Sequence, residues 1–179
     1  MEKLIFIGVI AIFSTGEKEG VDMKTTRRVM WGLLIFPLLT IPFIGKKSFF
    51  RFLPSATFVT LLLSIISEIA HSRRWWKVKT HIIPDLVTNV SFVLSLFFIG
   101  TLWVFKFSFD NLFKYLGINL ILDWLFAYPL TNLFQRMRIF RLIHFKQQYI
   151  FFMFISFAIF IYGFQRTIEK YINKNKMTV

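Results

Sequence analysis

The stretch LFKYLGINLILDWLFAYPLTNLF, residues 112–134, decides the fold class of this protein. It is long and apolar enough to cross the roughly 30 Å hydrocarbon core of a bilayer as a helix. Backbone groups in lipid must be satisfied within their own segment, and this segment lacks the alternation of a membrane barrel strand. We therefore expect a transmembrane helix here, with Asp123 near its centre.

The same apolar character extends along the chain of 179 residues, which is 56% hydrophobic, contains 25 phenylalanines and has a mean hydropathy of +0.61. A soluble domain is less apolar and much poorer in aromatic residues. Five blocks are expected to span a membrane: 29–44, 53–70, 86–105, 112–134 and 149–164. The sequence predicts an all-α, polytopic transmembrane bundle of about five helices over 29–164, between an N-terminal segment, 1–28, and a polar basic tail, 165–179.

The chain is strongly basic, with 22 Lys and Arg residues and a net charge of +13. These residues fall almost entirely between the apolar blocks, where cytoplasmic loops and anionic headgroups attract them. No nucleic-acid-binding motif accompanies the charge, so a nucleic-acid partner is not expected. The absence of cysteine excludes disulfides and thiolate metal sites.

The distribution of basic residues predicts an orientation. Placing the N-terminal side, 71–85 and 135–148 in the cytoplasm puts twelve Lys and Arg residues inside and nine outside. The tail opposes this arrangement, so the side of the C-terminus stays open. We expect a multi-pass protein of the cell membrane, of the bacterial cytoplasmic type.

The beginning of the chain, MEKLIFIGVIAIFSTG (1–16), has an apolar core too short to span a bilayer. A signal peptide and an interfacial helix are two interpretations. A third is that Met23 is the true initiator, because the codons for the preceding EGV can form a ribosome-binding sequence. Whether translation starts at Met1 or Met23 is left open.

Two basic segments join the predicted spans, and both suit a headgroup layer. The first, HSRRWWKVKTHIIPD (71–85), carries the interfacial residues Arg73, Arg74, Trp75, Trp76 and Lys77. We interpret it as a solvated loop that anchors topology, with a specific lipid or partner site as the alternative. The second, QRMRIFRLIHFKQQ (135–148), is interpreted in the same way, with an amphipathic surface helix as the alternative.

Glu68 and His71 form a Glu-x-x-His pair on one helix face. Di-iron bundles use this pair, but they need two copies and further carboxylates. Other side chains at the same membrane face that could complete a site are His81, Asp85 and His144. A single copy is more typical of an ion-paired helix end, and no arrangement resembles a catalytic triad. We expect no metal, no other cofactor and no enzymatic activity.

Asp123 is the most informative polar residue. An ionised aspartate at the bilayer centre costs about 2.5–3.5 kcal/mol on insertion scales, so such a residue usually faces the bundle interior. Asn119 lies one turn earlier on the same face. We expect Asp123 to be protonated and to donate a hydrogen bond to the third block, which offers Asn89, Ser91 and Ser95. A proton- or substrate-handling role is the alternative to this polar clasp.

Several stretches resemble a family of small multi-pass membrane proteins from spore-forming Gram-positive bacteria. They are RFLPSATF (51–58), RRWWK (73–77), GTLWVFKFSF (100–109), NLILDWLFAYPL (119–130) and YGFQRTIEK (162–170). The similarity covers about residues 29–170. It implies a location and an architecture, and it supplies no catalytic residues.

These observations predict a small integral membrane protein that acts as a structural or accessory component, binding anionic lipid, partner helices or a second copy of itself. The second hypothesis is a small oligomeric proton-coupled transporter or channel that uses Asp123. The third is a membrane-embedded, metal-dependent enzyme.

Overall fold

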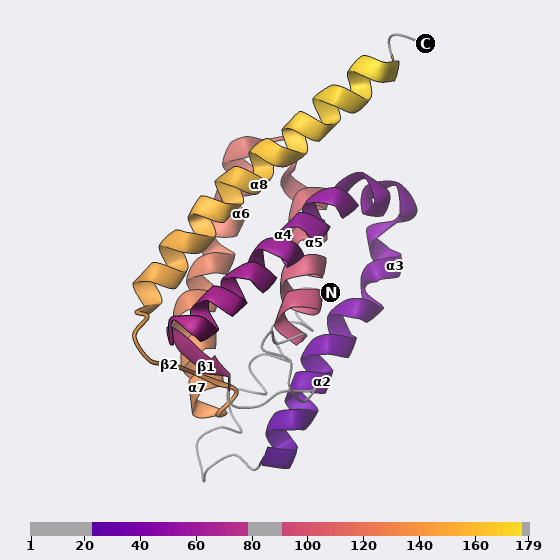
Figure 1. Cartoon of the computed structure of the whole chain (residues 1–179). Helices are drawn as coiled ribbons and strands as arrows, with labels where there is room; N and C mark the ends of the chain where they lie inside the picture. The colour runs from indigo at the N-terminus through magenta and orange to yellow at the C-terminus, as the bar shows by residue number, and fades with distance from the viewer. Residues whose placement is uncertain (1–22, 79–90, 177–179) are drawn as a thin grey trace.

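The structure, a computed structural model, describes residues 23–78 and 91–176, and helices dominate it (Figure 1). The helices are α2 (Met23–Leu39), α3 (Ile41–Ile44), α4 (Lys46–Ser72), α5 (Phe98–Ser108), α6 (Leu112–Leu125), α7 (Thr131–Arg136) and α8 (Gln147–Lys176). Two π-helical stretches, η2 (Ser91–Phe97) and η3 (Phe126–Leu130), lead into α5 and join α6 to α7. Two short strands are β1 (Trp76–Val78) and β2 (Phe140–Leu142). The predicted all-α class is confirmed, apart from these strands.

Three helices are long and apolar enough to cross a membrane by length and composition: Thr25–Ile44, Lys46–Ser72 and Gln147–Ile172. The predicted blocks 86–105 and 112–134 correspond to η2 with α5 and to α6 with η3 and α7, and neither is among the three. Helices able to span a membrane are thus present, but the predicted number of about five is not confirmed.

Two helices extend beyond the blocks predicted for them. The second block, 53–70, lies in a helix that already begins at Lys46, so Pro54 is inside α4 rather than at its start. The last block, 149–164, lies in a helix that continues to Lys176. Most of the predicted polar tail is therefore the final part of α8, where helix geometry keeps its polar side chains in register with α4.

Four helices form the core of the molecule. Helix α4 packs beside α5 and α8, and α6 also packs beside α5 and α8 (Figure 1). The contact of Arg51 with Glu169, near the start of α4 and the end of α8, shows that these two helices run antiparallel. The N-terminal pair α2 and α3 packs against η2 and α5 and makes none of the larger contacts with α6 or α8.

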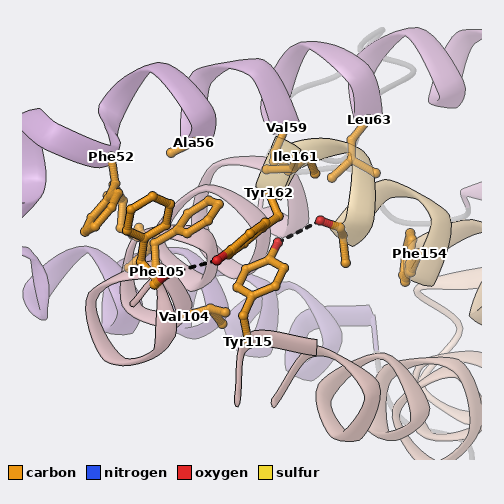
Figure 2. Close-up of a cluster of buried hydrophobic side chains, with 14 of the residues drawn as sticks. Phe52, Ala56, Val59, Leu63, Val104, Phe105, Tyr115, Phe154, Ile161 and Tyr162 are labelled. Atoms are coloured by element: carbon orange, nitrogen blue, oxygen red, sulfur yellow. Dashed lines mark hydrogen bonds between the residues drawn. The ribbon is translucent and has the colours of Figure 1, made fainter. Parts of the chain in front are cut away.

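Aromatic side chains fill the centre of this core (Figure 2). The Phe105 ring lies between the rings of Phe52 and Tyr115, with centroid distances of 5.4 and 5.1 Å and interplanar angles of 16° and 18°. The Tyr115 hydroxyl donates to the Ala158 carbonyl oxygen at 3.1 Å. Because each ring comes from a different helix, the stack joins α4, α5 and α6, and the hydroxyl adds α8.

A polar cluster joins α4 to α8, and we call it the α4–α8 clasp: Arg51, Ser55, Gln165 and Glu169. The Ser55 hydroxyl donates to Gln165 Oε1 at 2.7 Å, and both side chains are fully buried. Gln165 Nε2 donates to the Arg51 carbonyl oxygen at 3.1 Å. The Arg51 guanidinium holds both carboxylate oxygens of Glu169, at 2.7 and 2.9 Å. The buried amide is thus satisfied on both sides.

Helices α4 and α7 end in the same way. Trp75 N donates to the Ala70 carbonyl oxygen at 2.9 Å, and Ile139 N donates to the Phe134 carbonyl oxygen at 3.0 Å. These bonds close a Schellman motif, whose left-handed position is usually a glycine. Arginine occupies that position both times, with φ of 54° at Arg74 and 56° at Arg138.

Each of these turns leads directly into a strand, and the two strands pair antiparallel, with Lys77 opposite Arg141. Between the end of α7 and the start of α8, segment 135–148 is therefore a turn and strand β2, and the alternative of an amphipathic surface helix is wrong. The Schellman turn at Arg138 stops the helix, and pairing with β1 satisfies the extended backbone that follows. The pairing also places the two predicted basic segments at the same end of the bundle.

The core helices form two similar hairpins. In the first, α4 is followed by β1 and later by η2 and α5; in the second, α6, η3 and α7 are followed by β2 and α8. The first arms are α4 and the run α6–η3–α7, and the second arms are η2 with α5, and α8. Each first arm contacts both second arms. Antiparallel pairing of equivalent strands fits an approximate two-fold axis along the bundle, passing near the pair of Lys77 and Arg141.

The α4–α8 clasp should show a measurable coupling between its two buried members. For Ser55→Ala, Gln165→Ala and the double variant, we expect a coupling free energy of about 0.6–1.7 kcal/mol, the range found for hydrogen bonds between membrane helices. Reversible unfolding in mixed micelles measures it. Ser156→Ala is the control, because that exposed hydroxyl bonds only to Phe152 of its own helix. Additive effects of Ser55→Ala and Gln165→Ala would show that the two side chains do not interact.

Candidate functional site

A cavity of about 70 Å³ lies between the four core helices. Its polar lining is Thr101 from α5 and Tyr115, Asn119 and Asp123 from α6. The rest of the lining is apolar and comes from α4, η2, α5 and α8. The space is large enough for a few water molecules or a small ion.

Helix α6 brings three polar groups to this cavity because of their spacing. Tyr115, Asn119 and Asp123 are four residues apart, which places them on one stripe of an α-helix. The Asn119 side-chain nitrogen donates to the Tyr115 carbonyl oxygen at 2.8 Å, which leaves its own oxygen as a free acceptor by valence. The prediction that Asn119 and Asp123 share one inward face is confirmed.

The hydrogen bond predicted between Asp123 and the third block lies only partly within the described residues. Its Oδ2 atom is buried and has no hydrogen-bond partner in the part of the chain that the structure describes. Of the predicted partners, Asn89 and the side chain of Ser91 lie outside the described residues, and Ser95 is not part of the cavity lining. The polar clasp expected at Asp123 therefore stays a prediction, and among the described residues the α4–α8 clasp is a polar link between helices.

In the part of the chain that the structure describes, the surroundings of Asp123 supply no positive charge. No basic side chain lines the cavity. Along the continuous helical run that holds Asp123, the flanking basic residues are Lys114 and Arg136. At 1.5 Å per residue they lie about 14 and about 20 Å away along the axis. A buried carboxyl oxygen without a partner is exceptional in native proteins and is typical of a site that takes up a proton, water or ion.

The candidate metal ligands that the structure describes do not come together. Glu68 and His71 are both exposed on α4, and His144 Nδ1 lies 3.2 Å from the Arg74 carbonyl oxygen. Among the described residues no group of three or more His, Asp or Glu side chains could hold a metal ion. His81 and Asp85 lie outside those residues.

The predicted interfacial residues follow the end of α4, and the last two of them lie in strand β1. They are Arg73, Arg74, Trp75, Trp76 and Lys77. The Trp75 ring stacks on Phe145 at 4.7 Å, and Trp76 meets the same ring edge-on at 5.8 Å. Phe145 belongs to the second basic segment, so both segments build one aromatic cluster. Sequence patterns placed each segment at a membrane face, but only tertiary structure pairs them.

Sequence reasoning missed several residues of the core site and of the clasp. Thr101 and Tyr115 line the cavity, and their only signal was the position of Tyr115 one turn before Asn119. Gln165 and Glu169, four residues apart in a segment assigned to a tail, were a signal for a further helical turn facing a polar partner.

Removing the Asp123 carboxyl should not weaken the fold. An unsatisfied buried polar group costs about 1–3 kcal/mol, so Asp123→Leu should leave the free energy of unfolding unchanged or raise it by about 1 kcal/mol. Asp123→Asn should be nearly neutral. Unfolding in mixed micelles is the measurement, with Asn119→Leu as the control that removes a formed hydrogen bond. A loss above about 1 kcal/mol in Asp123→Leu would mean that the carboxyl has a structural partner.

The chemistry of the cavity has to be inferred from its own geometry. The resemblance to membrane proteins of spore-forming bacteria stays a prediction based on short stretches of sequence. No protein-family model, curated protein or solved structure matches this chain.

Proposed function

We propose that this protein is a multi-pass protein of the cell membrane that crosses the bilayer five times. Three helices meet the length and hydropathy needed to span it. The other two crossings are η2 with α5 and the run α6–η3–α7. These two crossings pack against each other and run in opposite directions. The N-terminal side, 71–85 and 135–148 face the cytoplasm, which agrees with their basic residues.

The arrangement of one end of the bundle supports this topology. Strand pairing brings the two basic segments together. The Thr26 hydroxyl donates to the Met137 carbonyl oxygen at 3.0 Å, which adds the start of α2 to the same end. An odd number of crossings then puts the end of α8 on the opposite side.

Within this topology, the function that the geometry supports best is binding and transfer of a proton or a small cation at Asp123. The observation that carries it is the buried Oδ2 atom, which belongs to a residue that lines the cavity and has no partner among the described residues. A carboxyl group at this depth gains most from a proton or a cation. The oxygens of Thr101 and Asn119 are further acceptors in the same cavity.

The cavity lies within a single small bundle, so transfer across the membrane would use a path that widens transiently or is completed by further copies. The accessory role predicted from the sequence is the alternative. It gains less support, because the buried Oδ2 atom of Asp123 makes no hydrogen bond to a described residue, and it predicts that Asp123 is dispensable.

Asp123→Asn should fold normally and lose ion handling, because an amide does not release a proton or carry a charge. The measurement is dissipation of a pH gradient, and of Na⁺ and K⁺ gradients, in proteoliposomes with equal protein content. Glu68→Gln, which neutralises an exposed carboxylate, is the matched control. Wild-type protein that dissipates no gradient, or an Asp123→Asn variant with full activity, would contradict the proposal and favour the accessory role.

Single-cysteine labelling tests the topology, because the chain has no cysteine of its own. Ser72→Cys and Gln148→Cys should be protected from an impermeant maleimide in intact cells, and Asn111→Cys should react. All three positions are exposed or lie in turns at the ends of helices. Labelling of Ser72→Cys and Gln148→Cys from opposite sides would rule out five crossings. Labelling of both from outside would invert the orientation.

A further inference from the structure

The pair of strands at one end of the bundle has an outward face made of two basic side chains. Residues directly opposite each other in an antiparallel pair point to the same face, and alternate residues point to opposite faces. Phe140 and Leu142 are half-buried and pack against the two hydrophobic clusters of the protein. Lys77 and Arg141 are therefore on the other face, and both are exposed.

This placement is unfavourable for the protein alone. Like charges directly opposite each other on one face of a strand pair repel each other. Among the described residues, the ion pair between Arg51 and Glu169 lies at the other end of the bundle. An anion between Lys77 and Arg141 would turn this repulsion into two charge-assisted hydrogen bonds.

A third basic residue stands beside the pair at a strained position. Arg74 has a φ of 54° where a Schellman motif ordinarily has glycine, and its side chain is exposed. Its backbone is held in place by the turn and by His144, whose Nδ1 lies 3.2 Å from the Arg74 carbonyl oxygen. Glycine would fit this backbone with less strain, so the side chain is not explained by the fold.

The aromatic residues around Lys77 and Arg141 indicate the depth of these two side chains in the membrane. Trp75 and Trp76 pack with Phe145, and Phe145 packs with Tyr149 at 5.5 Å. Trp and Tyr gather at the level of the lipid headgroups, where their rings meet both apolar and polar surroundings. The basic face therefore lies where the phosphate groups of lipids lie.

We infer that Arg74, Lys77 and Arg141 form a binding site for the phosphate headgroup of an anionic phospholipid. The two strands hold Lys77 and Arg141 at a fixed spacing, and the left-handed turn presents Arg74 at one end of the pair. This goes beyond general attraction of basic loops to a membrane, because the cross-strand register fixes which side chains share one phosphate. The site is independent of Asp123, which lies near the middle of α6.

Lipid retention by the full-length protein tests this inference. The protein in detergent micelles is incubated with phosphatidylglycerol or phosphatidylcholine, and bound lipid is counted by native mass spectrometry. Phosphatidylglycerol should be retained preferentially. Arg74→Gly should lower the affinity for phosphatidylglycerol about fivefold, and Lys77→Ala with Arg141→Ala should lower it further. The reason is that each basic residue near an anionic membrane surface strengthens binding by a comparable factor.

Two controls separate a site from nonspecific charge and from misfolding. Lys46→Ala with Lys47→Ala removes two exposed charges at the opposite end of the bundle and should leave retention unchanged. Arg74→Gly should unfold at the same or a higher temperature than the wild type, because glycine relieves the strain at this φ. Lost retention in a variant of undiminished stability would identify the side chain as a ligand.

Three results would overturn the inference. Equal retention by all variants would reduce the segment to a topological signal. A clear loss of stability in Arg74→Gly would give that side chain a structural role. Displacement of the lipid by about 1 mM inorganic phosphate, a concentration at which an ordinary weak site is half-filled, would assign the site to a soluble anion rather than to a headgroup.

Discussion

In hydrocarbon, a polar side chain has to find its partner inside the protein, and this constraint organises the whole molecule. The Ser55 hydroxyl and the Gln165 amide are fully buried and bond to each other. The Tyr115 hydroxyl reaches a carbonyl oxygen on α8. These bonds set the register of α4, α6 and α8, and they leave Asp123 as the carboxyl group whose buried oxygen lacks a partner in the described chain.

The contrast between the two ends of the bundle follows from the same constraint. At the end near the start of α4, Arg51 is paired with Glu169 and lies 5.0 Å from the Phe109 ring centroid, so its charge is used within the protein. At the other end, Lys77 and Arg141 face outward side by side. A charge satisfied internally stabilises a helix contact, whereas exposed charges of one sign are arranged for an external anion.

The two similar hairpins explain why the cavity between the helices and the basic face at one end of the bundle both lie near one approximate axis. An approximate two-fold axis passes between the paired strands and among the four core helices. Near such an axis, equivalent side chains from the two hairpins meet, and a difference between them creates an asymmetric site. Val59 on α4 and Asp123 on α6 line the same cavity, and only the second hairpin contributes a carboxyl group.

The sequence by itself determined the helical class, the inward stripe of Asn119 and Asp123, and the two basic segments. These are local properties: hydropathy over some twenty residues, the 3.6-residue period and the clustering of charge. The tertiary structure decided the rest, namely the strand pairing of the basic segments, the helical course of the tail and the lack of a partner for Asp123 Oδ2 among the described residues. Each of these depends on residues far apart in the chain, such as Lys77 with Arg141 and Ser55 with Gln165, whose meeting is fixed by how the helices pack. A pattern within one segment does not encode which distant group will face a given side chain, or whether any group will.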